Sequence, residues 1–405
     1  MRHATSTLNR PPRTVLPLTN MRVNSKRRQT MVYELFLRLL PVRRIQASCC
    51  ILALVALTAA DPALHASKLP QAKKLTAGDI DDIVKRLRTA VQDYVFPETA
   101  AKLARELEAH QETYRTLTDP SNLAQRLTAD MRAVGLDQHL AVTFGEELGV
   151  RKNPTAAENQ HAHDFDRANA YGLRSARRLP GNIGYIDLAY FSPDPDAGAA
   201  IAAAMQVVNG TDALIIDLRR NGGGSGDTER TLASYFLTDV LELSSIVENV
   251  DGKPRQRQHW TVAYLQGPRY VGKPVYILAS RHTHSAAEAL SYDLQNLHVA
   301  TIIGEHTSGD ATSSTGEVDL GHGFSAFIPN GQMVSPVTHS NYFRVGVQPD
   351  TPIPPEKALS MAYDLALKTA EMSVASEELA KEKSEAAKNP EAALLEEING
   401  FSQNR

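Results

Sequence analysis

The chain has 405 residues, with 43 basic and 46 acidic side chains and a formal net charge of −3. This near-neutral balance lacks the strong positive charge typical of nucleic-acid-binding proteins, so we expect no nucleic acid as a partner. Its two cysteines, Cys49 and Cys50, fall in an N-terminal segment that we expect to be removed. The mature chain would then have no disulfide, no thiolate metal site and no cysteine-protease chemistry.

Residues 1–60 have the pattern of a secretory signal peptide. Basic residues between positions 22 and 44 precede an apolar segment of about twelve residues that ends in Thr58-Ala59-Ala60. The segment is short for a membrane span, so we expect cleavage near Ala60 or Ala66 and no span in the mature chain. The predicted location is periplasmic or secreted, with an uncleaved signal anchor as the alternative. Because the basic region is long, Met31 is a second candidate start.

Three helices are predicted in residues 68–145, which we take as a small helical N-terminal domain. The first shows apolar residues at helical spacing over 80–91, the second covers 100–114 and the third 123–134. Residues 146–178 are polar and contain Asn153-Pro154, so they are interpreted as a linker.

An alternation of strands and helices follows in residues 179–360 and predicts an α/β layered core. Apolar runs predict strands at 181–188, 213–218, 275–279 and 300–303; helices are expected over 194–209, after Asp227, and over 285–297. Residues 361–405 are interpreted as a helical C-terminal tail, rich in Ala, Glu and Lys after position 371 and interrupted at Asn389-Pro390.

Ser285 stands where an apolar strand ends and a helix-forming run begins. A serine on such a turn has an exposed hydroxyl, and the unpaired first amides of the helix point toward whatever it would attack. This is the geometry of an acyl-transfer nucleophile. The alternative is that Ser285 only caps the helix, with Glu288 completing a capping box.

Asn221-Gly222-Gly223-Gly224 directly follows another buried strand, 213–218. Amides in a glycine turn can form an anion-binding nest, which suits an oxyanion hole. The alternative is a flexible turn, and no Gly-Lys-Ser/Thr follows that would indicate a phosphate loop.

Four motifs in this order resemble the C-terminal-processing (tail-specific) serine peptidases, most closely the branch of tricorn core protease and interphotoreceptor retinoid-binding protein. They are Asp217-Leu218-Arg219-Arg220-Asn221-Gly222-Gly223-Gly224, Ser285-Ala286-Ala287-Glu288, Gly304-Glu305-His306-Thr307-Ser308-Gly309 and Gly346-Val347-Gln348-Pro349-Asp350. The resemblance covers roughly residues 70–360. It implies a crotonase-like (ClpP/crotonase) core, polypeptide substrates and Ser285 as nucleophile. It also implies oxyanion donation by the amides of Ala286 and of a glycine such as Gly222 or Gly223.

The general base implied by this resemblance is His139, in Asp137-Gln138-His139-Leu140. Ser-Lys members of the family carry a lysine just after the Gly-x-x-Thr-x-Gly motif, but the residue here is Asp310, which excludes that dyad. Tricorn-like members use an earlier histidine, and histidine titrates near neutral pH. Without the resemblance, His139 would be interpreted as an ordinary turn residue.

Phe343 departs from the family pattern, because tricorn-like members have a glutamate at this place. A phenyl ring cannot orient an imidazole, so Glu288, which we group with the catalytic residues, or Asp137 would have to compensate. The departure supports an alternative function, a catalytically weak or inactive member that binds an apolar ligand or peptide.

Residues beside the motifs are candidates for substrate binding, namely Asn221, Gly224, His284 and His306. His282 and His284 form a His-x-His pair that could also bind a metal or act as an alternative base, but no third ligand stands at a suitable spacing. We expect no metal and no cofactor. The 146–178 segment is too short for the PDZ domain that many processing proteases carry, so substrate tails would be recognised without one.

Overall fold

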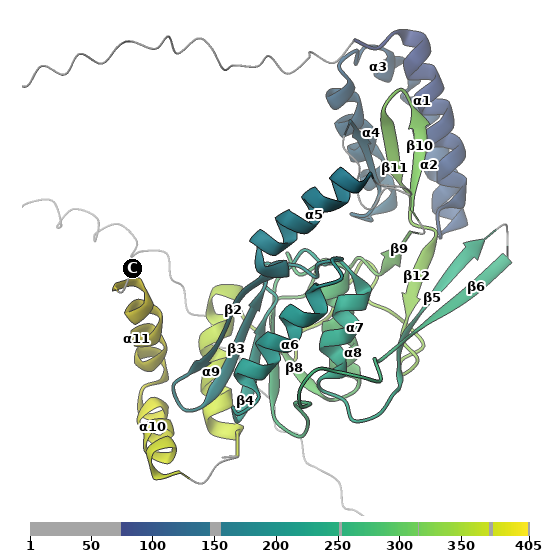
Figure 1. Cartoon of the computed structure of the whole chain (residues 1–405). Coiled ribbons are helices and arrows are strands. Elements are labelled where there is room, and N and C mark those ends of the chain that lie inside the picture. Colours follow the sequence, from purple (N-terminus) through teal and green to yellow (C-terminus); the bar gives the residue numbers. More distant parts are fainter. Residues whose placement is uncertain (1–73, 146–154, 251–252, 315, 372–375, 404–405) are drawn as a thin grey trace, which may run out of the picture. The chain divides into compact units, whose positions relative to one another are not determined.

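The computed structural model describes residues 74–145, 155–250, 253–314, 316–371 and 376–403 (Figure 1). The predicted signal peptide lies outside these residues. None of the described helices has both the length and the apolar character needed to cross a membrane.

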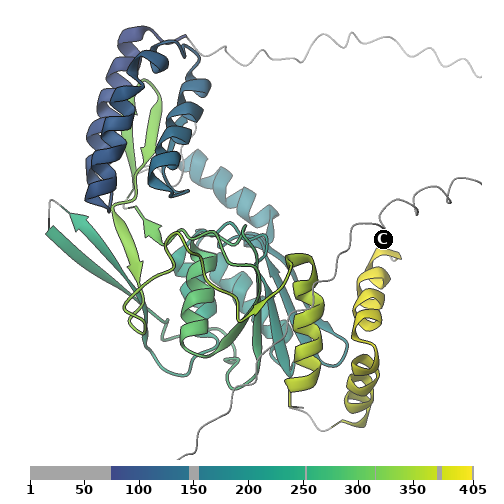
Figure 2. The ribbon, with the colours of Figure 1, turned by 180° about the vertical axis from the view of Figure 1, so that it is seen from behind.

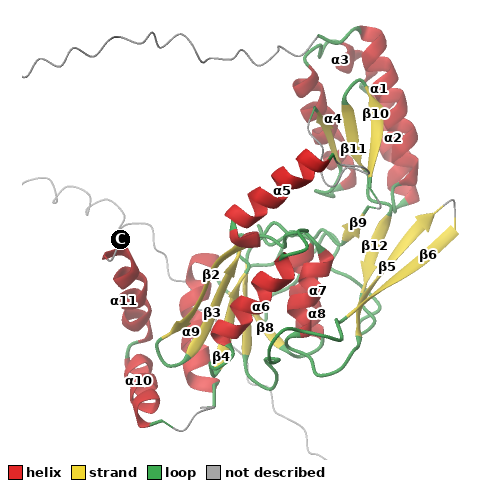
Figure 3. Cartoon of the chain, in the orientation of Figure 1, coloured by secondary structure: helices red, strands yellow, loops and turns green. Residues whose placement is uncertain are grey.

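A six-stranded sheet in the order β13-β8-β7-β4-β3-β2 is the centre of the core (Figure 3). All neighbouring pairs are parallel except β2, which runs antiparallel to β3. The strands are β2 (Leu173–Leu179), β3 (Ile183–Leu188), β4 (Ala213–Asp217), β7 (Val275–Ala279), β8 (Ala300–Gly304) and β13 (Thr351–Pro352). The carboxyl ends of β4 and β7 therefore meet at one edge, which is where parallel sheets place their sites.

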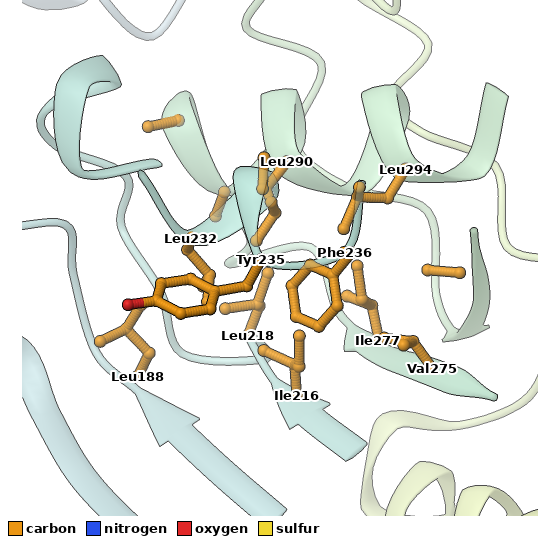
Figure 4. Close-up of a cluster of buried hydrophobic side chains, with 14 of the residues drawn as sticks. Leu188, Ile216, Leu218, Leu232, Tyr235, Phe236, Val275, Ile277, Leu290 and Leu294 are labelled. Carbon is orange, nitrogen blue, oxygen red and sulfur yellow. The ribbon is translucent and has the colours of Figure 1, made fainter. Parts of the chain in front are cut away.

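Helices cover both faces of this sheet, which explains why β4 and β7 are continuous apolar runs. Leu214 and Ile216 of β4 belong to one buried cluster with residues of α6 (Ala197–Val208), α7 (Gly226–Ser234) and α8 (Ala286–Asn296). Figure 4 shows part of this cluster, including Ile216 and, from the helices, Leu232 and Leu290. Ala213 and Ile215, on the opposite face, pack with α9 (Pro355–Thr369). The predicted layered α/β core is confirmed.

The helical module contains α1 (Ala77–Ala90), α2 (Pro97–Ala109), the short α3 (Gln111–Arg115) and α4 (Pro120–Gly135). A hairpin from the C-terminal half completes it. β11 (Phe324–Phe327) pairs with β1 (Ala141–Phe144) on one side and with β10 (Glu317–Gly321) on the other. The hairpin adds Leu320 and Phe324 to the module's apolar core (Figures 1 and 2). The predicted domain 68–145 is therefore not self-contained, because part of its core comes from residues 317–327.

The prediction of a linker over residues 146–178 is wrong for residues 155–178, the part of it that the structure describes. Residues Ala156–Ala168 form α5, capped by Thr155 through a capping box with Glu158, and β2 starts at Leu173. Asp166 fixes α5 to the core by accepting hydrogen bonds from Tyr190 and Ser192 hydroxyls at 2.8 and 2.7 Å. The polar sequence misled the prediction because β2 is a partly exposed edge strand with three arginines.

A second sheet has the order β6-β5-β12-β9 and consists of β5 (Glu242–Val250), β6 (Lys253–Trp260), β9 (Thr312–Ser313) and β12 (Gly331–Val334). α10 (Glu377–Lys388) and α11 (Pro390–Gln403) each contact α9. The predicted tail boundary at 361 cuts through α9, which belongs to the core, whereas the predicted interruption at Asn389 separates α10 from α11.

Two carboxyl groups, one from α7 and one from α8, interact where these helices contact each other. Glu229 and Asp293 are only 3% and 2% exposed, and among the described residues no hydrogen bond reaches Glu229 Oε1 or either Asp293 oxygen. Burial raises the pKa of both carboxyls, and for Asp293 the Glu229 charge adds to the rise. The pair is therefore stable only while it holds protons.

We expect Glu229→Gln to flatten the dependence of stability on pH. A carboxyl whose folded pKa is raised contributes its full stability below its ordinary value of 4.5, and that contribution is lost as pH rises toward the folded pKa. Glutamine cannot ionise, so the variant should match the parent near pH 5 and exceed it by about 1–2 kcal/mol near pH 8 in urea unfolding. Asp227→Asn, at an 87% exposed carboxyl on the same helix, is the control. An unchanged pH slope for Glu229→Gln would contradict the assignment.

Candidate active site

Ser285 occupies the turn between β7 and α8, at the carboxyl end of the central sheet. Its φ of 52° and ψ of −118° are rare for a residue other than glycine and cost about 1–3 kcal/mol. A strained serine on a strand-to-helix turn carries its hydroxyl away from the sheet. Ala286, next along the chain, contributes the first amide of α8, which has no acceptor within the helix.

The glycine turn, residues 221–224, packs directly against Ser285. A Cβ atom on Gly223 would lie 2.7 Å from Ser285 Cβ and 2.8 Å from the carbonyl oxygen of His284. Gly223 also has a φ of 90°, in the region that favours glycine. A Cβ on Gly222 would meet no atom within 4 Å. The close approach to the nucleophile therefore requires a glycine at position 223 and not at position 222.

The amides of Gly222 and Gly223 have acceptors within the fold, and the oxyanion role of these glycines stays a prediction. The Gly222 amide donates to the Ala189 carbonyl at 3.2 Å, and the Gly223 amide donates to Asn221 Oδ1 at 2.8 Å. The asparagine side chain thus closes the turn on itself. Of the three predicted donors, Ala286 keeps its amide at the start of a helix.

The predicted substrate-binding residues lie in different environments. Asn221 is fully buried, and its side chain joins Gly223 to the Leu188 carbonyl, which holds the turn; substrate contact by Asn221 stays a prediction. Gly224 lies so close to the backbone of Phe191 that a Cβ would come within 2.1 Å of its carbonyl oxygen. His306 is exposed, with Nδ1 2.9 Å from the Thr307 carbonyl. Substrate contact by Gly224 or His306 stays a prediction.

Glu288 is completely buried and ties the Ser285 turn to the loop at 307–310. Its carboxylate accepts from the Ser285 amide at 2.9 Å, from the amides of Gly309 and Asp310 at 2.6 and 3.0 Å, and from the hydroxyls of Thr307 and Ser308 at 2.6 and 2.9 Å. With both oxygens occupied, Glu288 cannot take a proton from Ser285. In this structure the carboxylate holds the nucleophile turn in place, and a catalytic role for Glu288 stays a prediction.

His139 lies beside the nucleophile turn, although it belongs to the helical module. Its ring packs at 4.8 Å against the ring of His284, the residue before Ser285. Nδ1 lies 3.0 Å from Thr312 Oγ1, and the Thr312 hydroxyl donates to Asp137 Oδ2 at 2.9 Å. This series of hydrogen bonds places a proton on Nδ1 and leaves Nε2 as the nitrogen with a free lone pair.

Asp137 is the buried carboxylate at the end of this hydrogen-bond series. It has no exposed surface and accepts from the Tyr94 hydroxyl at 3.0 Å and from the His139 amide at 2.9 Å, in addition to Thr312. Burial and the Asp137 charge raise the pKa of Tyr94, which keeps the phenol protonated as a donor. Sequence reasoning named Asp137 only as a possible substitute and missed Tyr94 and Thr312, for which no local signal exists.

His284 and Asp310 form an ion pair on the other side of His139. His284 Nε2 lies 3.0 Å from Asp310 Oδ2. Burial lowers the pKa of His284, but the adjacent Asp310 carboxylate outweighs it and raises the pKa overall. Burial opposes ionisation of Asp310, yet the contacts with His284 and the Gln138 amide hold its pKa at about 2. Substrate contact by His284 stays a prediction.

Phe343, at the place of the family glutamate, is part of the contact between the module and the core. Its ring stacks on Phe96 of the helical module at 4.8 Å, and the guanidinium of Arg344 lies 5.0 Å from its centre. Arg344 also donates to the Gly135 carbonyl at 2.8 Å. The phenyl ring therefore packs the module that carries His139 against the core.

Two groups of side chains could hold a cation. Ligand atoms of Asp137, His139 and Asp310 lie within 4.8 Å of one another, as do those of His163, Asp194 and Asp196. In the first group the Asp137 oxygens already accept hydrogen bonds from the Tyr94 and Thr312 hydroxyls, and a metal would have to displace them.

Comparison with known families decides the assignment. Residues 182–353 match the model of peptidase family S41, and residues 69–167 match the N-terminal domain of peptidase S41 in eukaryotic IRBP. The chain belongs to peptidase family S41. This confirms the predicted family and makes the chain a member of a serine-peptidase family whose matched region contains Ser285.

The chain is also similar to curated proteins named as carboxyl-terminal-processing proteases, over part of the length of each. The carboxyl-terminal-processing protease of Synechocystis sp. is 29% identical over 173 residues, which are 42% of this chain and 38% of that protein. Carboxyl-terminal-processing peptidase 2, chloroplastic, of Arabidopsis thaliana is 28% identical over 219 residues, 51% of this chain and 40% of that protein. The chain thus spans about two fifths of the length of these relatives.

Solved structures of similar fold include a lipoprotein from Streptococcus agalactiae and the photosystem II D1 C-terminal processing protease. The first has a TM-score of 0.48 and 15% identity, and the match covers 72% of this chain and 96% of that chain. The second has a TM-score of 0.43 and 18% identity, with 69% and 94% covered.

We expect Gly223→Ala to reduce peptidase activity strongly, while Gly222→Ala leaves most of it. The added methyl at 223 would overlap Ser285 Cβ and strain a φ of 90°, whereas the methyl at 222 enters open space. The first substitution should also lower the free energy of unfolding by about 1–3 kcal/mol. Cleavage rates and urea unfolding of both variants measure this. Similar losses in the two variants would contradict the proposed contact.

Proposed function

We propose that this S41 member is a serine endopeptidase that cuts polypeptides near unstructured carboxyl termini, with Ser285 as nucleophile and His139 as general base. The supporting observation is the contact between the rings of His139 and His284, at 4.8 Å. It brings a basic nitrogen from the helical module to the residue that precedes the strained serine.

In this mechanism the Ser285 hydroxyl attacks the carbonyl carbon of the scissile peptide, and its proton passes to His139 Nε2. The carbonyl oxygen becomes an oxyanion, which the Ala286 amide and the positive end of α8 stabilise. Protonated His139 then gives its proton to the leaving amine as the peptide bond breaks. Water hydrolyses the resulting ester of Ser285 by the same route.

The Asp137 carboxylate supports His139 in both protonation states. Through the Thr312 hydroxyl it fixes the Nδ1–H tautomer before attack, and its negative charge stabilises the imidazolium afterwards. It fills the orienting role that Phe343 cannot perform.

The substrate class rests on the relatives, whose names describe carboxyl-terminal processing. Among the described residues, β1 and α5 are the elements between α4 and the first core strand, and they form no PDZ-like domain. Substrate tails would then be recognised without a PDZ domain. We propose a periplasmic or secreted location because residues 1–60 have the pattern of a signal peptide.

The test is cleavage of an unstructured polypeptide with an apolar carboxyl end, followed by mass spectrometry at near-neutral pH. The mature protein should cut it, while Ser285→Ala and His139→Ala should lose nearly all turnover, because they remove the nucleophile and its base. The control is His282→Ala, a change at an exposed histidine three positions before Ser285 that should keep activity.

If neither the folded parent nor Ser285→Ala cleaved the polypeptide, the result would contradict the peptidase proposal. Binding of the same peptide without turnover would then favour the alternative, a binding-only family member, as the phenyl ring of Phe343 suggests.

Thr312 offers a second test of the proposed proton path. Thr312→Val keeps the shape but removes the hydroxyl between His139 and Asp137, so kcat should fall about tenfold or more, the equivalent of one lost hydrogen bond. Thr312→Ser retains the hydroxyl and should stay close to the parent. Steady-state kinetics of both variants decide the matter: equal kcat values would remove Thr312 from the path.

A further inference from the structure

We propose that His139, His284 and Asp310 form a binding site for a divalent transition-metal ion such as Zn²⁺, and that an ion bound there inhibits the peptidase reversibly. The metal site does not depend on the proposed function, but the inhibition rests on it, because it takes His139 as the base. The spacing of residues near His284 offers no third ligand, whereas folding brings two ligands to it from distant segments.

The first two ligand atoms belong to His284 and Asp310. His284 Nε2 and Asp310 Oδ2 lie 3.0 Å apart, yet among the described residues no hydrogen bond reaches this buried oxygen. Asp310 is only 3% exposed, and a buried carboxylate oxygen without a donor is costly. Two atoms that each bind one zinc ion at about 2.0–2.2 Å lie roughly 3–3.5 Å from each other. The separation of Nε2 and Oδ2 therefore fits a shared cation.

His139 is in position to add a second nitrogen. One of its ligand atoms lies within 4.8 Å of an Asp310 oxygen, and its ring centre lies 4.8 Å from that of His284, with 63° between the ring planes. Because Nδ1 contacts the Thr312 hydroxyl, the lone pair of Nε2 is available. Three protein ligands of the imidazole and carboxylate type, with a fourth position left open, are a common zinc arrangement.

The groups around these ligands are those that support a bound metal. A metal-binding histidine usually donates its other ring N–H to an acceptor, and a ligating carboxylate is itself hydrogen-bonded. His139 Nδ1 lies 3.0 Å from the Thr312 hydroxyl, which donates to Asp137, and Asp310 Oδ1 accepts from the Gln138 amide at 2.9 Å. With His284 as the third ligand, Asp137 need not bind the ion and keeps the hydrogen bonds that it accepts.

The ligand types favour Zn²⁺ over Ca²⁺ or Mg²⁺. Imidazole nitrogens suit zinc, copper and nickel, whereas calcium and magnesium prefer oxygen ligands only. The other cluster that could hold a cation has one imidazole, and its Asp196 is exposed. In that cluster His163 Nδ1 and Asp194 Oδ2 already form a hydrogen bond at 2.8 Å. We therefore expect the tighter zinc site at His139, His284 and Asp310.

An ion at this site would stop the proposed reaction. The lone pair of His139 Nε2 that takes the proton from Ser285 would be bound to the metal, so the serine would lose its base. The side chains need little movement to bind the ion, since their ligand atoms are already close together. Zinc should therefore abolish turnover without unfolding the protein, and a chelator should restore it.

The first experiment measures binding of Zn²⁺ alone by isothermal titration calorimetry at near-neutral pH, which needs no activity. We expect the mature protein to bind zinc and Asp310→Asn to bind it at least about tenfold more weakly. Asparagine keeps an oxygen for the Gln138 amide, so the variant should fold, and urea unfolding checks this. His282→Ala, at an exposed histidine, and His163→Ala, in the other cluster, should both match the parent affinity. Equal zinc affinity of the parent and Asp310→Asn would overturn the site.

Co²⁺ in place of Zn²⁺ reports on the ligands directly. Cobalt held by four or five ligands absorbs visible light more strongly than the hydrated ion, so the parent should develop visible bands. These bands should disappear in Asp310→Asn and in His284→Gln, each of which loses one ligand. Bands that survive in both variants would place the metal elsewhere and overturn the proposal.

Peptide cleavage separates the metal site from the proposed function. Zn²⁺ should inhibit the parent over the concentration range in which calorimetry shows binding, EDTA should restore the rate, and the inhibition constant for Asp310→Asn should rise at least about tenfold. If zinc binds as expected and the parent cuts no peptide with or without metal, the site stands and the peptidase function fails. Full cleavage by the zinc-saturated parent would overturn the inhibitory role.

Discussion

The carboxylate of Glu288 accepts hydrogen bonds from five donors on two segments of chain, and the geometry around Ser285 depends on it. A buried carboxylate is tolerated only when donors replace the water that it loses. Here those donors are the Ser285 amide and four groups of residues 307–310. The serine turn and this loop therefore cannot move independently, and the loop in turn carries Asp310 and leads to Thr312.

The position of the proposed base, His139, depends on the same loop that Glu288 holds. His139 comes from the helical module, which the structure fixes to the core by polar contacts at Asp310 and Thr312 and by the stack of Phe96 on Phe343. The hairpin at 317–327 strengthens the connection, because it leaves the core to complete the module's apolar cluster. Base and nucleophile thus lie on separate modules, and their alignment depends on the packing between those modules.

The two departures from the family pattern acquire a physical meaning in this arrangement. Asp310 cannot act as a lysine would, but it joins the His284 ring to the base segment. Phe343 cannot orient an imidazole, but its ring packs against the module that carries His139, while Asp137 supplies the orienting charge through Thr312. The orienting and positioning roles that the family pattern assigns to a glutamate and a lysine are thus filled here by other polar side chains, which come together only in the folded protein.

The layered core and the placement of Ser285 could be predicted from the sequence, because apolar strands and the helix start are encoded by residues close in the chain: the run at 275–279 and β7 coincide. The same local logic failed for β2, whose arginines disguise an edge strand. Only the tertiary structure decided the rest of the site. Thr312 meets His139 and Asp137, Tyr94 meets Asp137, and His284 meets Asp310, through contacts between distant segments. Such contacts leave no periodicity or spacing in the chain, since they depend on how the elements pack and not on which residues adjoin.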